Sequence, residues 1–86
     1  MKIRGAVIIE QGVTFAIVAV KASVTRYTVR SVQMRQELSM YFPNMPIILM
    51  SWDNDGQPHY YGRKDIVDFL KTINVNQIPW KEFTIY

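Results

Sequence analysis

Residues 13–20, with the sequence Val-Thr-Phe-Ala-Ile-Val-Ala-Val, carry apolar side chains at every position except Thr14. A strand with one face in water has polar residues at every second position, and this segment lacks that alternation. Strands that are apolar on both faces are typical of sheets with covering structure on both sides. The segment therefore predicts a strand inside a sheet that is covered on both faces.

A second strand is predicted directly before this segment. Residues 3–9 are rich in valine and isoleucine, and the dipeptide Gln11-Gly12 separates them from residues 13–20. Two β-rich segments joined by two residues that include a glycine are typical of a β-hairpin. We expect residues 3–20 to form such a hairpin.

The second half of the chain predicts another hairpin. Residues 46–52 have the sequence Pro-Ile-Ile-Leu-Met-Ser-Trp, and the tetrapeptide Asp53-Asn54-Asp55-Gly56 follows them. Asp and Asn accept hydrogen bonds from nearby backbone amides, and glycine permits positive φ, so the tetrapeptide predicts a turn. Residues 57–61 return as a short strand, in which Pro58 favours a position at the edge of the sheet.

The first helix is expected at about residues 31–41, after a connection at residues 21–30. Ser31 is the expected N-cap, because its hydroxyl can accept a hydrogen bond from a first-turn amide. Pro43 is expected to end the helix, because it disfavours the α conformation of Phe42.

The second helix is expected at about residues 63–73. Its apolar side chains recur with helical spacing at Ile66, Phe69, Leu70 and Ile73. The expected fold class is α+β, a two-layer or three-layer domain with the order strand, strand, helix, strand, strand, helix.

We interpret residues 1–86 as one domain. Residues 1–43 and 44–73 each contribute a hairpin and a helix, and residues 74–86 form an aromatic tail whose residues 83–86 are a candidate fifth strand.

Residues 46–73, and in a longer alignment residues 15–73, resemble the second half of a thioredoxin-like domain. Pro46 stands at the start of a strand, where that family has a cis-proline, while Asp55-Gly56, Tyr61-Gly62 and the segment 65–70 correspond to its last hairpin and helix. The chain contains no cysteine and so lacks the Cys-x-x-Cys of the family. The resemblance implies a related fold without the redox activity, and a binder that presents a peptide site at Pro46.

The composition excludes several classes of site and indicates self-association. Without cysteine, the chain has no disulfide and no zinc–thiolate site, which suits a cytoplasmic protein. Lys2 and Arg4 precede an apolar run that Glu10 ends too early for a signal peptide, and residues 13–20 are too short to span a membrane. Hydrophobic residues make up 49% of the 86 residues, more than a core of this size easily covers. We therefore expect a homodimer.

Two groups of basic residues are candidate anion sites. Lys21, Arg26, Arg30 and Arg35 lie close together in sequence with Tyr27 among them, and arginines beside an aromatic ring are the ingredients of a nucleic-acid site. Arg63 and Lys64 at the start of the second expected helix could hold an anion.

Other residue patterns point to no catalytic or metal site. His59 is the only histidine and has no Gly-x-Ser-x-Gly context, so we interpret it as structural or exposed. The turn at residues 53–56 lacks the spacing of a calcium loop, and we expect no metal and no cofactor.

The sequence leaves two functions open. The first is a small, non-enzymatic interaction module that forms a homodimer and meets a further protein partner. The alternative is a nucleic-acid-associated protein that uses the basic stretch from Lys21 to Arg35.

Overall fold

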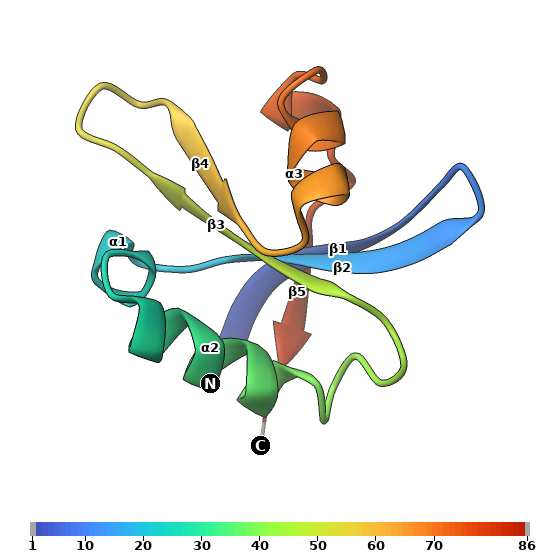
Figure 1. Cartoon of the computed structure of the whole chain (residues 1–86), viewed down its shortest axis with the longest axis horizontal. Coiled ribbons are helices and arrows are strands. Elements are labelled where there is room, and N and C mark those ends of the chain that lie inside the picture. Colours follow the sequence, from blue (N-terminus) through green and yellow to red (C-terminus); the bar gives the residue numbers. More distant parts are fainter. Residues whose placement is uncertain (1, 86) are drawn as a thin grey trace.

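A computed structural model describes residues 2–85, which form a five-stranded mixed sheet with three helices and a 3₁₀ turn. The strand order is β4-β3-β2-β1-β5 (Figure 1). All neighbouring strands are antiparallel except β2 and β3, which are parallel. The expected α+β fold class is confirmed.

The N-terminal hairpin consists of β1 (Lys2–Glu10) and β2 (Val13–Ala19). Gln11 and Gly12 have φ values of 52° and 78°, as both central residues of a type I′ turn require. The turn suits the right-handed twist of the strands, and it fixes a register in which Glu10 lies opposite Val13. The predicted hairpin is confirmed.

The connection between β2 and β3 differs from the prediction. Residues 21–30 are not an irregular connection, because they contain α1 (Ala22–Thr25) and the start of α2 (Thr28–Leu38). Their β-branched residues lower helix propensity, but packing on the sheet outweighs this preference. The hydroxyl of Thr25, for example, is buried 2.8 Å from that of Ser51 in β3.

Both predicted ends of the first helix are wrong. Ser31 is not the N-cap, because it lies inside α2 and its hydroxyl donates to the carbonyl of Thr28 at 2.9 Å. The helix ends at Leu38, before the expected Tyr41, and a turn leads to Phe42. Leu38 and Phe42 both pack in the core on this face of the sheet.

The second hairpin consists of β3 (Ile47–Trp52) and β4 (Pro58–Tyr61). The predicted turn is confirmed: the amide of Asp53 donates to the carbonyl of Gln57, and the carboxylate of Asp53 accepts from two amides of the turn. As Pro58 indicated, β4 is an edge strand.

The chain turns sharply from β4 into α3 (Lys64–Leu70) at Gly62. Gly62 has a φ of 153°, and a Cβ there would lie 2.5 Å from Cδ1 of Ile48 and 3.1 Å from the carbonyl oxygen of Ile47. Glycine is therefore required for the chain to pass this close to β3.

After α3, which ends three residues before the predicted Ile73, a 3₁₀ turn η1 (Val75–Gln77) leads to β5 (Lys81–Thr84). The tail does add a fifth strand, two residues earlier than expected; Tyr86 lies outside the described residues. β5 pairs with residues 2–5 at the start of β1.

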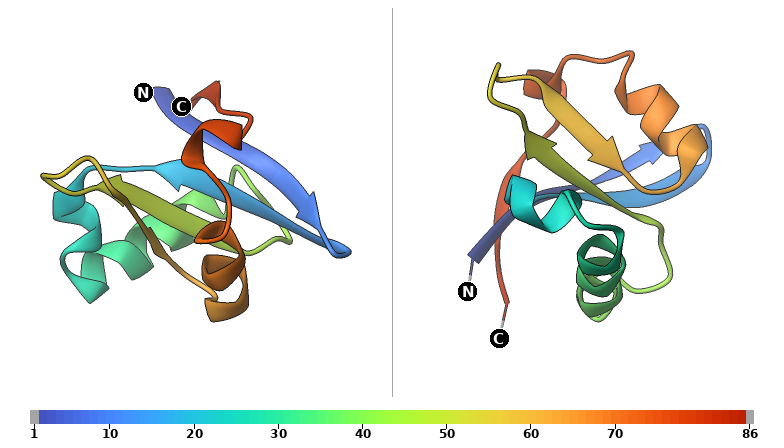
Figure 2. Two further views of the ribbon diagram at one scale, coloured as in Figure 1. Left: turned by 90° about the horizontal axis from the view of Figure 1, so that it is seen from above. Right: turned by 60° about the vertical axis from the view of Figure 1, so that its left-hand side comes forward.

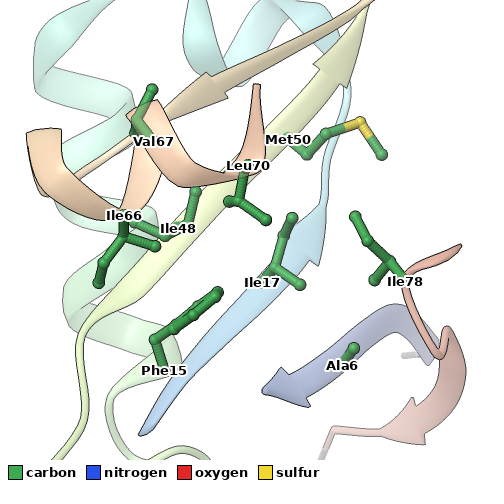
Figure 3. Close-up of a cluster of buried hydrophobic side chains, with 9 residues drawn as sticks. All are labelled: Ala6, Phe15, Ile17, Ile48, Met50, Ile66, Val67, Leu70 and Ile78. Atoms are coloured by element: carbon green, nitrogen blue, oxygen red, sulfur yellow. The ribbon is translucent and has the colours of Figure 1, made fainter. Parts of the chain in front are cut away.

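The sheet has an apolar core on each face. Figure 1 shows α1 and α2 on one face and α3 with the following tail on the other. Figure 3 shows the larger core, on the α3 side, where Phe15 and Ile17 of β2 meet Ile66 and Leu70 of α3. Ala16 and Val18 of β2 point to the α2 side. The prediction of a strand covered on both faces is confirmed for residues 15–18, whereas Thr14 beside the turn is exposed.

Candidate functional site

The principal concave site lies across the free edge of β4, where a groove of about 640 Å³ separates the α1–α2 side from α3. Figure 2 shows β4 at the outer edge of the sheet between these two layers. We call this site the edge groove. Its polar and aromatic lining consists of Thr25, Arg26, Thr28, Ser31 and Arg35 on one side, Lys64, Asp68 and Lys71 on the other, and Tyr60 and Tyr61 between them.

The edge groove is positively charged. It contains four cationic side chains and one carboxylate, Asp68. Lys64 donates to Asp68 at 2.9 Å, and this hydrogen bond raises the pKa of Lys64. Within residues 2–85, no carboxylate lies at ion-pair distance from Arg26, Arg35 or Lys71. The groove thus holds three positive charges with no partner of opposite sign in the described part of the chain.

Arg35 is the most enclosed of these cations. Its Nε atom is buried and has no hydrogen-bond partner in the described structure. Its side chain also lines a second cavity of about 360 Å³, which reaches Pro46 and Arg63. A buried guanidinium N–H without a partner is costly, and the partly enclosed side chain holds the positive charge of Arg35 at the wall of the edge groove.

The main chain of β4 adds further hydrogen-bonding groups. In an antiparallel pair, opposed residues alternate between hydrogen-bonded and non-hydrogen-bonded pairs. The bond from Asp53 to Gln57 sets this alternation, so His59 and Tyr61 direct their N–H and C=O groups to β3. Tyr60 then directs its N–H and C=O groups away from β3, towards the edge groove, and the N–H of Gly62 points the same way. Pro58, which has no N–H, also falls at an outward position, where it costs no bond to β3.

The structure divides the predicted basic cluster. Arg26 and Arg35 line the edge groove, whereas Lys21, Tyr27 and Arg30 lie outside it on the exposed surface of the first two helices. The guanidinium of Arg30 lies 5.5 Å from the centroid of the Tyr27 ring, which is 55% exposed.

The two cations of the other predicted anion site are already paired. Arg63 donates to both carboxylate oxygens of Asp65 at 2.7 and 2.8 Å, and Asp65 raises the pKa of Arg63 through this hydrogen bond. Lys64 is bound to Asp68 but faces the edge groove. The sequence did not show that Lys64 and Arg35, from the two separate predicted sites, line the same groove.

His59 forms an exposed pair with Asp53. Its Nε2 lies 2.8 Å from a carboxylate oxygen of Asp53, across the turn that joins β3 and β4. The pKa of Asp53 lies below its ordinary value of 3.8, mainly because the backbone amide of Gln57 donates to the carboxylate and secondarily because of His59.

We expect His59→Gln to shift the thermal unfolding midpoint by less than about 4 °C between pH 5 and 8, as is usual for a surface change in a chain of this length. A carboxylate with a lowered pKa stabilises the fold fully above its ordinary pKa, and this contribution is lost as the pH falls through the lowered value. The range from pH 5 to 8 lies above both the ordinary and the lowered pKa of Asp53, so this contribution stays constant across it. Circular dichroism melts at three pH values test this, and a shift above about 8 °C would contradict a peripheral role for His59.

A second surface, which the sequence analysis missed, lies at the other edge of the sheet. β5 pairs with β1 only at residues 2–5, so residues 6–10 have no neighbouring strand on that side within the described structure. Val7 is 44% and Ile9 71% exposed. The sequence alone does not reveal this open edge, because its extent depends on the residue at which β5 begins to pair with β1.

Among residues 2–85, no three His, Asp or Glu side chains gather where they could hold a metal ion. No helix in the described residues is long and apolar enough to cross a membrane. Comparisons with protein-family models, with curated proteins and with solved structures gave no match.

Proposed function

We propose that this protein is a non-catalytic interaction module that forms a homodimer by pairing the open part of β1 with the same segment of a second copy. The observation that carries this proposal is the unpaired edge of β1 at residues 6–10, which is apolar from Ala6 to Ile9 and bears one charge, Glu10, beside the turn. An apolar sheet edge that no strand covers associates readily with another strand. The left view of Figure 2 supports access to this edge, because the β1–β2 hairpin extends beyond the helices.

The backbone of this edge is ready to pair. Glu10 and Val13 flank the two-residue turn and form the hydrogen-bonded pair that such a hairpin requires. Alternation along β1 then directs the N–H and C=O groups of Val7 and Ile9 away from β2. These four groups face the open side of the sheet.

One register of two β1 strands fits the open edge. If Ile8 lies opposite Ile8 of a second copy around a two-fold axis, Val7 of each copy lies opposite Ile9 of the other copy. Both pairs are of the hydrogen-bonded kind, so the contact gains four backbone hydrogen bonds. The exposed side chains of Val7 and Ile9 then pack together on one face, and no like charges are directly opposite each other.

Sedimentation equilibrium tests the proposal on the whole chain. At micromolar concentration we expect about twice the chain mass of 10.1 kDa. A monomer at all concentrations up to about 100 μM would contradict the homodimer, because stable homodimer interfaces have far lower dissociation constants.

The alternative function is nucleic-acid association, and the exposed Tyr27–Arg30 pair favours it. An exposed aromatic ring beside a guanidinium offers a surface on which an unpaired base can stack. Arg26 and Arg35 would contact phosphates beside it.

For this alternative, we expect the triple change of Arg26, Arg30 and Arg35 to Gln to flatten the slope of log K against log salt by about 2 to 3. Tyr27→Ala should weaken single strands by about 1–3 kcal/mol and duplexes less. Fluorescence anisotropy between 50 and 200 mM salt measures both. If the wild type binds neither single-stranded nor duplex DNA at 50 mM salt, this alternative is excluded.

A further inference from the structure

We propose that the edge groove binds an extended acidic segment of another protein, which adds a strand to β4. This site is separate from the homodimer edge, because β4 and β1 lie on opposite sides of the central strands. Dimerisation through β1 would leave a β4 edge free at each end of the joined sheet.

The backbone supports strand addition. The outward N–H and C=O groups of Tyr60 and the outward N–H of Gly62 match the hydrogen-bonding pattern of an incoming strand. Peptides that add a strand to a sheet edge gain affinity from such main-chain bonds and specificity from the pockets beside the edge.

The walls of the groove support an acidic occupant. Side chains of a strand alternate between the two faces of a sheet, so those of an added strand would point in turn to the α1–α2 side and to the α3 side. Each side presents cations: Arg26 and Arg35 on the first, Lys64 and Lys71 on the second. Carboxylates on successive residues could therefore meet a positive charge on both sides.

The same charges argue against a second copy in this groove. Two β4 edges that paired around a two-fold axis would bring the two sets of cations towards each other, and like charges across an interface are unfavourable.

A nucleic-acid strand fits this groove less well than an acidic peptide. The exposed ring of Tyr27, on which a base would stack, lies outside the groove. A nucleotide chain also lacks the regular amide pattern that the edge of β4 matches.

The test uses the full chain and a fluorescein-labelled decapeptide of glutamate, whose carboxylates point to both faces of an added strand, measured by fluorescence anisotropy in 50 mM salt. We expect saturable binding that weakens with salt, and slower hydrogen exchange of the Tyr60 and Gly62 amides on binding. Arg35→Gln should weaken binding about tenfold, because it removes a charge from the contact. Lys81→Gln removes an equal charge from exposed β5 and should leave binding unchanged.

Two matched probes distinguish strand addition from attraction by charge alone. Two N-methylated forms of the same peptide keep its charge: one is methylated at the odd-numbered amides and the other at the even-numbered amides. At least one of the two forms should lose binding about tenfold or more. Equal binding of all three peptides would overturn strand addition. Three results would overturn the acidic-peptide site: absence of binding, equal binding by a decapeptide of lysine, or tighter binding of a twenty-nucleotide thymidine strand that Arg35→Gln weakens. Circular dichroism confirms that each variant is folded.

Discussion

Replacing Leu70 by alanine should lower the free energy of unfolding by about 3–5 kcal/mol, the cost of a Leu→Ala cavity in a well-packed core. Leu70 has no exposed surface and lies in the core that joins α3 to β2 and β3 (Figure 3). Leu70 is the last residue of α3, and its neighbours in this core include Phe15 and Ile17 of β2.

Urea denaturation followed by circular dichroism measures this loss. Leu70→Met is the matched control, because it conserves volume and should cost less than about 1.5 kcal/mol. If Leu70→Ala cost no more than Leu70→Met, the packing of α3 on the sheet would be wrong.

Replacing Ile9 by lysine should raise the dissociation constant of the homodimer at least about 100-fold. Each copy would lose a buried isoleucine contact, and two losses of about 1.5 kcal/mol together correspond to a factor of about 100. A lysine on an edge strand also opposes pairing with a second strand. Sedimentation equilibrium should therefore give a mass close to 10.1 kDa at concentrations where the wild type is dimeric.

The matched control for this change is Val29→Lys on α2. Val29 is 68% exposed, against 71% for Ile9, but it lies away from the β1 edge. If both variants stayed dimeric, the interface would lie elsewhere; if Val29→Lys alone dissociated the dimer, the outer face of α2 would be the interface. Unchanged unfolding midpoints would show that neither change acts through the fold.

The sequence predicted the parts of the fold that local chemistry determines. The continuous apolar pattern of residues 13–20, the Gln11-Gly12 turn and the turn at residues 53–56 each have a local physical cause, and each is confirmed. The segment 21–30 was misassigned because its β-branched residues have low helix propensity, while contacts with the sheet, such as that between Thr25 and Ser51, come from distant parts of the chain.

The candidate sites depend even more on tertiary structure. Arg35 and Lys64 were predicted as members of two separate anion sites, and only the packing of α2 and α3 on opposite faces, beside the same edge strand, brings them to one groove. The open edge at residues 6–10 arises because β5 begins opposite Gly5, a register that no local signal specifies. The resemblance to thioredoxin-like domains stays a prediction.

The parallel pairing of β2 with β3 has a consequence for the order in which the chain folds. The β1–β2 hairpin closes over two residues and can form within about 1–10 μs. Pairing Ala16 with Ile47 instead requires a long loop to close, and α1 and α2 must pack on the sheet within that loop. We therefore expect the hairpin to form early and the central parallel pair to be the slow step. Changes in β3 should then mainly slow folding. We expect β5 to dock after this step, so changes in β5 should mainly speed unfolding.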